Sequence, residues 1–150
     1  CGECGGDGGD EDNDGICDDV DPCIGLYNNG YYCADLQVLD DFININPVLD
    51  TAGLEVSDIG LTVGIADWEF GRLIYLSLAN QDLIAVPNSI GTLDSLEVLF
   101  LNNNDLTSLP ESICDLPATC DIYVQENNLC EEFHYSCIDI WGEGTQDCND

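Results

Sequence analysis

The chain has 150 residues, of which 31 are acidic, and Arg72 is its only lysine or arginine, so the formal net charge is -30. Such a charge repels nucleic acid and anionic membranes and makes cations the natural small partners. At this length, with 45% hydrophobic residues, the sequence suits one capped domain rather than two independent cores. The acidity also has a simpler interpretation, which is a generic solvated surface.

Ten cysteines in so short a chain indicate disulfides formed in an oxidising compartment. No stretch reaches the roughly 18 to 20 apolar residues of a membrane span, and no signal peptide remains at the start. We therefore expect a secreted, already processed protein that works outside the cell or at the cell surface. The disulfide candidates are Cys1, Cys4, Cys17, Cys23, Cys33, Cys114, Cys120, Cys130, Cys137 and Cys148.

The first region, residues 1–33, is rich in cysteine and aspartate, and its first 23 residues have too few apolar side chains to fold alone. A 12-residue loop over residues 10–21 carries acids at positions 1, 3, 5, 9 and 12, with Gly15 at position 6. Oxygens at this spacing converge on one hard cation, and the glycine permits a sharp turn. The sequence therefore predicts a calcium site, in which Ile16 offers its carbonyl. The expected ligands are Asp10, Asp12, Asp14, Ile16, Asp18 and Asp21.

The flanks of this loop exclude the two helices of an EF-hand, because glycines precede it and Pro22-Cys23 follow it. The loop resembles a thrombospondin type 3 calcium repeat, whose DxDxDGxxDxxD pattern it matches. This resemblance implies a non-helical, cysteine-linked calcium site. Three alternatives stay open, namely a disordered acidic tail, a zinc or redox CxxC at Cys1 and Cys4, and a lipid anchor on Cys1.

The second region, residues 34–72, is predicted to cap the N-terminal end of the domain. Apolar residues recur at helical spacing within residues 35–46, and Pro47 then stops the pattern. Residues 61–68 and 73–78 read as two extended runs joined by a turn at residues 70–71. The apolar face of the helix is expected to consist of Leu36, Leu39, Phe42 and Ile43. Trp68, which ends the first extended run, is expected to cover an open end of the core rather than to bind a sugar.

A 23-residue repeat spans residues 73–129. Its apolar positions are Leu73, Leu76, Leu78 and Leu83, then Leu96, Leu99, Leu101 and Leu106, then Thr119, Ile122, Val124 and Leu129. Asn104 and Asn127 occupy one recurring position, and Gln81 replaces asparagine there in the first repeat. The pattern resembles the LxxLxLxxNxL motif of the leucine-rich repeat family.

This resemblance implies a leucine-rich repeat solenoid, with short β-strands, irregular or 3-10 convex turns, an α-helical N-terminal cap and a disulfide-bearing C-terminal cap. Residues 73–118 would form the repeats, and residues 119–150 the last repeat and the C-terminal cap. The resemblance also implies that residues between the strand leucines face outward. The candidate partner-binding patch is Tyr75, Val98, Phe100 and Tyr123. In the alternative, a cap or loop of the same chain covers this patch.

Five cysteines lie in residues 1–33 and five in residues 114–148, and both numbers are odd. We therefore expect a leftover thiol at each end, or a head-to-tail bridge between protomers, because a disulfide cannot span the separation between the ends unless the N-terminal segment folds back. We expect Cys114 to bond Cys120, since Cys114 replaces Gly91 of the preceding repeat and Cys120 begins the next strand.

The sequence offers little support for catalysis. His134 is the only histidine, lysine is absent, and no GxSxG, phosphate-loop or HExxH motif occurs. His134 beside Glu131 and Glu132 reads as a surface histidine rather than a metal ligand. We expect a non-catalytic, calcium-stabilised structural or recognition module that acts on other protein chains. The alternatives are a protomer of a filament or surface layer, whose partners are copies of itself, and a carbohydrate-cleaving enzyme.

Overall fold

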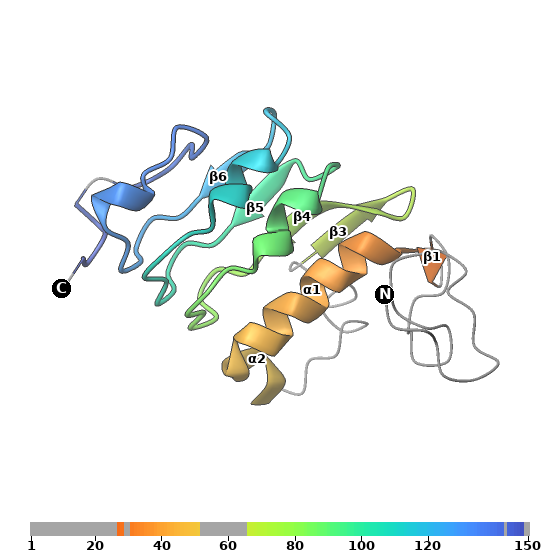
Figure 1. The fold of residues 1–150 in the computed structure, drawn as a ribbon, viewed down its shortest axis with the longest axis horizontal. Coiled ribbons are helices and arrows are strands. Elements are labelled where there is room, and N and C mark those ends of the chain that lie inside the picture. The colour runs from red at the N-terminus through yellow and green to blue at the C-terminus, as the bar shows by residue number, and fades with distance from the viewer. Residues whose placement is uncertain (1–26, 29–30, 52–65, 143, 149–150) are drawn as a thin grey trace, which may run out of the picture.

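The computed structural model describes residues 27–28, 31–51, 66–142 and 144–148 (Figure 1). Two short strands, β1 (Tyr27–Asn28) and β2 (Tyr31–Tyr32), pair antiparallel ahead of helix α1 (Cys33–Ile45) and helix α2 (Pro47–Thr51). The predicted helix over residues 35–46 is thereby confirmed. The predicted calcium loop, residues 10–21, lies outside the described residues.

A four-stranded sheet of order β3-β4-β5-β6 holds the rest of the regular strands. Strands β3 (Ala66–Glu69) and β4 (Arg72–Ser77) form an antiparallel hairpin, while β5 (Val98–Phe100) and β6 (Asp121–Tyr123) continue the sheet in parallel. Partners across the parallel strands are 23 residues apart, as in Leu76, Leu99 and Ile122. The 3-10 helices are η1 (Asn88–Thr92), η2 (Glu111–Asp115) and η3 (Glu131–Phe133).

The predicted solenoid was wrong. The described residues form a small mixed sheet of four strands with two α-helices, and the sheet is neither closed nor curled. Antiparallel β3 occupies one edge, and beyond β6 the described chain adds only an isolated bridge between Tyr123 and Ile140. A sequence period determines which residues of neighbouring strands are adjacent. It does not determine how many strands follow one another, and three parallel strands are too few to build up curvature.

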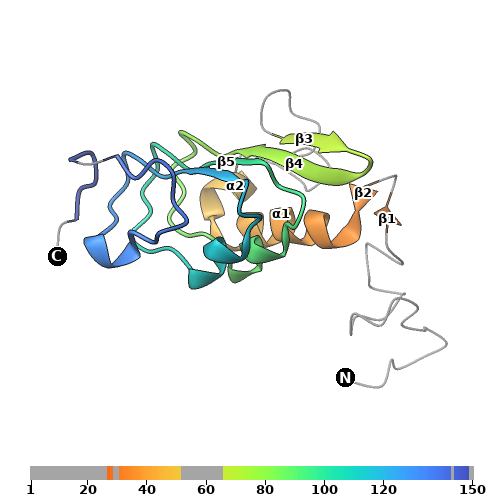
Figure 2. The same cartoon turned by 90° about the horizontal axis from the view of Figure 1, so that it is seen from above.

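Figure 2 shows the sheet along one side of the molecule and the helices along the other, and the core lies between these two layers. Repeat leucines such as Leu76, Leu99 and Leu101 are completely buried, as are Val38 and Phe42 of α1. Strand side chains alternate between faces, so burying the leucines turns their neighbours outward. The buried face of α1 differs from the predicted one. Leu36 and Ile43 are only half-buried, and the face consists of Asp35, Val38, Leu39 and Phe42.

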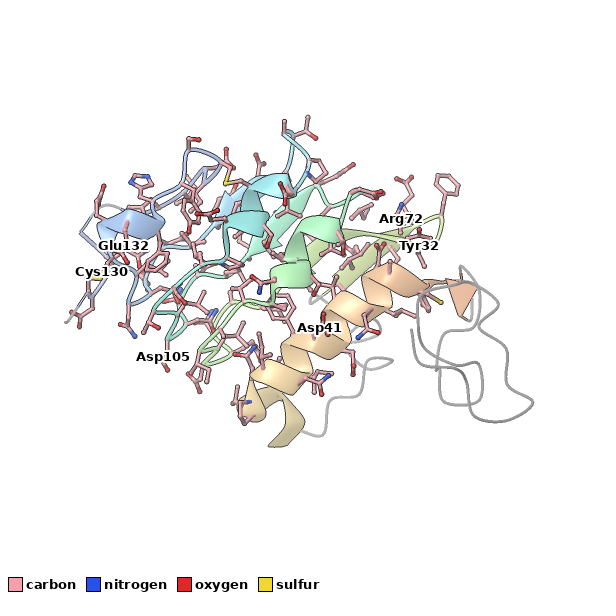
Figure 3. The ribbon with its side chains drawn as sticks, in the orientation of Figure 1. Tyr32, Asp41, Arg72, Asp105, Cys130 and Glu132 are labelled. Carbon is pink, nitrogen blue, oxygen red and sulfur yellow. A yellow bond between two sulfur atoms is a disulfide. The ribbon has the colours of Figure 1, made fainter. Side chains whose placement is uncertain are left out.

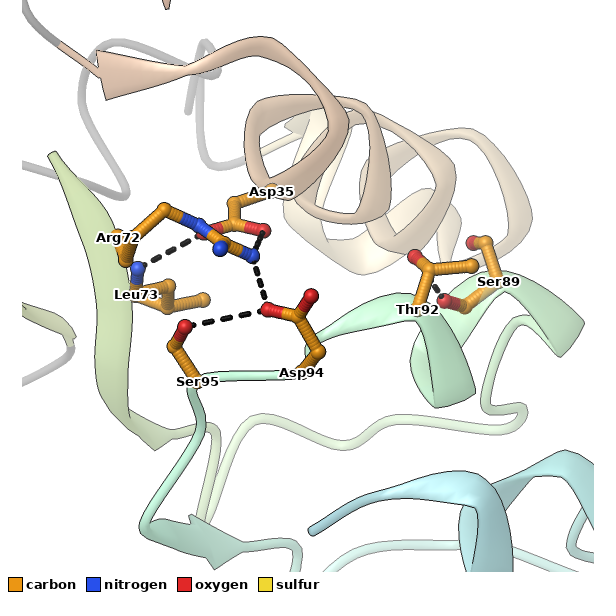
Figure 4. A network of polar contacts seen from close by, with 7 residues as sticks. All are labelled: Asp35, Arg72, Leu73, Ser89, Thr92, Asp94 and Ser95. Carbon is orange, nitrogen blue, oxygen red and sulfur yellow. Dashed lines mark hydrogen bonds and ion pairs between the residues drawn. The ribbon is translucent and has the colours of Figure 1, made fainter.

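Asp35 is buried because it meets the only arginine of the chain. Figure 3 shows Arg72 beside Tyr32, and its guanidinium carbon lies 4.2 Å from the centre of the Tyr32 ring. Arg72 donates to both carboxylate oxygens of Asp35, from Nε at 2.9 Å and from Nη2 at 3.1 Å, and Nη2 also donates to Asp94 (Figure 4). These hydrogen bonds to Asp35 raise the pKa of Arg72 above its ordinary value, against the opposing effect of burial. The charged pair therefore joins α1 to β4 and to the loop before β5.

Three buried asparagines, Asn46, Asn104 and Asn127, form hydrogen bonds with backbone groups of the loops through their side-chain amides. Asn104 Oδ1 accepts from the backbone N–H groups of Gln81 and Leu83, both at 3.0 Å, and its Nδ2 donates to two carbonyl oxygens, of Leu78 and Leu101. Asn127 makes similar contacts one strand later, where its Oδ1 accepts from the Leu106 N–H and its Nδ2 donates to the carbonyl oxygens of Leu101 and Val124.

Asn46, at the end of α1, does the same for the loop before η1. Its Oδ1 accepts from the N–H groups of Ile84 and Ala85, and its Nδ2 donates to the carbonyl oxygens of Phe42 and Ala85. From its spacing, Asn46 was predicted only to end a helix. No periodic signal marks it, because it lies outside the 23-residue register.

We expect Asn104→Ala to lower the free energy of unfolding by about 2 to 4 kcal/mol, because it leaves several buried backbone groups without partners. Urea unfolding followed by circular dichroism measures this change. The control is Asn102→Ala, a half-buried neighbour, which should cost less than about 0.5 kcal/mol. Equal effects of the two substitutions would contradict a structural role for the Asn104 amide.

Candidate protein-contact surface

The sheet presents an outer face made of the residues that alternate with the buried leucines. Strand pairing aligns two rows of residues across this face, which we call the first row and the second row. The first row is Asp67, Tyr75, Val98 and Asp121. The second row is Ser77, Phe100, Tyr123 and Ile140. The structure thus brings together all four residues of the predicted patch, and each is half-buried.

Three rings of this face contact one another in sequence. Phe100 stacks on Tyr123 with ring centres 4.5 Å apart and planes 21° apart, and Tyr75 lies against Phe100 at 5.8 Å. Stacked and tilted rings at these distances attract each other beyond their burial of apolar area. The three rings, which we call the aromatic row, therefore hold one another in place while one part of each ring remains accessible.

Ile140 and Asp67 extend the face beyond the predicted patch. Ile140 is 43% exposed and forms a parallel bridge with Tyr123, so it lengthens the apolar second row. Asp67 is exposed and lies opposite Tyr75. The 23-residue period could not identify either residue. Ile140 follows its partner Tyr123 by fewer than 23 residues, and Asp67 lies in an antiparallel strand. The hairpin predicted at residues 70–71 was the one available signal for Asp67.

Two disulfides join described residues, which confirms that the chain contains them. They are Cys114–Cys137 and Cys130–Cys148, with Cα atoms 5.5 Å and 4.9 Å apart. Cys33 is also disulfide-bonded. Cys1, Cys4, Cys17 and Cys23 lie outside the described residues.

The predicted Cys114–Cys120 bond was wrong. Residues 23 positions apart lie side by side in neighbouring strands, and the same spacing places Cys137 beside Cys114. The preceding equivalent position is Gly91, where a Cβ would lie 2.4 Å from the Ser112 carbonyl oxygen. The 23-residue period is therefore the signal in the sequence that identifies the correct pair.

Among the five cysteines of residues 114–148, Cys120 is the one with a free thiol, and it is buried. Burial raises the pKa of Cys120 to about 12, and the charges of Asp121 and Asp139 add to the rise. At neutral pH the thiol is protonated and a poor nucleophile. A covalent link between protomers therefore cannot form at Cys120 unless the C-terminal end opens.

The other candidate positions are accounted for by local contacts. His134 stacks on Trp141 with ring centres 4.6 Å apart, and its Nδ1 lies 3.3 Å from Glu131 Oε1. Trp68 packs partly against the core and contacts Tyr31 edge-on at 4.7 Å. Within the described part of the chain, no three histidine, cysteine or acidic residues are placed to hold a metal ion.

No protein-family model matches the chain, and neither a curated protein nor a solved structure matches it. Among the described residues, none of the helices combines the length and apolar character that crossing a membrane requires.

We expect Cys120 to resist iodoacetamide at pH 8 in the native protein and to react after denaturation, because burial and its raised pKa protect it. Digestion without reduction should then release Cys114 and Cys137 in one linked peptide. Removing this bond by Cys114→Ser and Cys137→Ser should cost about 3 kcal/mol of stability, as expected for a loop of this size. Cys120→Ala is the control and should leave the peptide map unchanged. Finding Cys120 in any linked peptide would refute this assignment.

Proposed function

We propose that the chain is a non-catalytic extracellular recognition module that binds another protein through the outer face of its sheet. The aromatic row carries this proposal, because it is a contiguous group of partly accessible rings, and contiguous apolar groups on a surface mark protein-contact sites. Disulfides support a location outside the cell. A single histidine and the absence of lysine support a non-catalytic role.

The likeness to two families belongs to the same proposal. The 23-residue register and the hydrogen bonds of Asn104 and Asn127 support kinship with the leucine-rich repeat family. The acid spacing of residues 10–21 supports a calcium site of the thrombospondin type 3 kind.

Contact between two copies at this face is less favourable than contact with a different protein. Each copy carries a formal charge of -30, so like faces repel unless cations lie between them. The buried Cys120 removes the simplest covalent link among the described cysteines. A filament would therefore depend on calcium or on residues outside the described part of the chain.

We expect Phe100→Asp to abolish partner binding while leaving the fold intact, because Phe100 faces outward. A random displayed peptide library selected on the wild-type chain supplies the ligands. Most selected peptides should fail to bind Phe100→Asp but should still bind Ile84→Asp, which changes an isoleucine 53% exposed outside the two rows. Peptides that bind Phe100→Asp as well as wild type would refute the proposal. Circular dichroism and thermal melting verify that each variant is folded.

We expect calcium to bind residues 10–21 weakly, with a dissociation constant on the order of 10⁻⁴ to 10⁻³ M. Calorimetry measures the binding, and protease sensitivity of residues 1–23 should fall when calcium is added. Asp12→Asn combined with Asp14→Asn should remove the heat of binding, while Asp105→Asn, outside the loop, should not. No heat at millimolar calcium, with unchanged proteolysis on chelation, would exclude the site.

A further inference from the structure

The outer face combines two kinds of group that recognise the same chemistry. Its first row has a carboxylate at each end, Asp67 and Asp121, with Tyr75 and Val98 between them. The rings of Phe100 and Tyr123 lie alongside in the second row. Carboxylates bind a guanidinium through paired hydrogen bonds, and aromatic rings attract it through their faces.

These two carboxylates have no cation to pair with in the described part of the chain. Both are exposed, and the ion pairs of the described residues include neither of them. Arg72 is the chain's only basic side chain other than His134, and it is occupied by Asp35 and Asp94. A positive group at Asp67 or Asp121 must therefore come from another molecule or from solvent.

The molecule already contains one site with this combination of groups. Arg72 lies over the Tyr32 ring, 4.2 Å from its centre, and pairs with the carboxylates of Asp35 and Asp94. The outer face offers a second set of rings and two further carboxylates, without the arginine. A second copy of this chain is not a suitable donor, because its only arginine is held in the same way.

We propose that the outer face binds an extended, arginine-bearing segment of a partner protein, with guanidinium groups paired to Asp67 and Asp121 and lying against the aromatic row. This inference rests on the proposed function and names the chemistry of the partner. Three strand intervals separate the two carboxylates, which is about 14 Å. An extended chain covers this distance in about four residues, so two arginines four positions apart fit the first row.

The test uses the five-residue peptide arginine-serine-leucine-serine-arginine, blocked at both ends, and two analogues in which lysine or neutral citrulline replaces both arginines. Calorimetry on the full chain in 0.15 M salt gives the dissociation constants, and NMR shift changes locate the peptide. We expect the arginine peptide to bind best, the lysine peptide several-fold more weakly, and the citrulline peptide not at all. Shift changes should centre on residues 75, 98, 100, 121 and 123.

Matched variants separate this site from general attraction to an acidic protein. Asp121→Asn and Tyr123→Leu should each weaken binding of the arginine peptide about three- to fivefold, the range for single exposed ion pairs and cation–ring contacts. The controls Asp105→Asn and Phe70→Leu remove one exposed charge and one exposed ring elsewhere, and each should change binding less than twofold (Figure 3 shows Asp105 on the loop after β5). Equal binding of the arginine and lysine peptides, with equal losses for Asp121→Asn and Asp105→Asn, would overturn the inference.

The failure of this inference is distinguishable from failure of the proposed function. If library peptides require Phe100 but contain no basic residues, the outer face is a contact surface and the arginine inference is wrong. If they ignore Phe100 and the arginine peptide shifts none of the five positions, both are wrong.

Discussion

The ion pair between Arg72 and Asp35 is the constraint on which the arrangement of the whole domain depends. It joins α1 to β4, and Asp35 Oδ2 also accepts from the Leu73 N–H at 2.9 Å, so one buried carboxylate satisfies a side chain and the strand backbone together. Arg72 is the only lysine or arginine among 31 acidic residues, so the chain has no second lysine or arginine that could pair with Asp35. Loss of the arginine would leave an unpaired buried charge, which is far more costly than the loss of a surface pair. Since β5 and β6 align on β4, the position of the outer face follows from this pair.

The sequence correctly predicted the parts of the fold that depend on the spacing of apolar residues along the chain. The helix and the hairpin turn follow from local spacing, and the alignment of Tyr75 with Val98 follows from the 23-residue period, because side chains on strands alternate and apolar positions must be buried. The overall shape could not be predicted in this way. Whether parallel strands curl depends on how many of them stack and on what pairs with the edges, and here an antiparallel strand and a single bridge take those positions.

The candidate surface was predicted in its centre and missed at its ends for the same reason. Tyr75, Val98, Phe100 and Tyr123 lie within the period, whereas Asp67 and Ile140 lie outside it. Buried polar groups are also poorly predicted from patterns, as Asp35 and Asn46 show. Each is buried because a specific partner distant in sequence satisfies it, and hydropathy alone assigns such residues to the surface. The disulfide error was different in kind, since the period contained the information that Cys114 and Cys137 are adjacent.

The rigidity of the surface connects the fold to its proposed role. The leucines beneath the aromatic row are completely buried, and two disulfides together with the Tyr123–Ile140 bridge fasten the chain at the C-terminal edge. The rings are consequently ordered before any partner arrives, which reduces the entropy lost on association. A net charge of -30 attracts a basic partner from a distance but does so at every face of the molecule. Selectivity must therefore come from short-range features, and the packed rings of the second row beside two exposed carboxylates of the first row are such a feature.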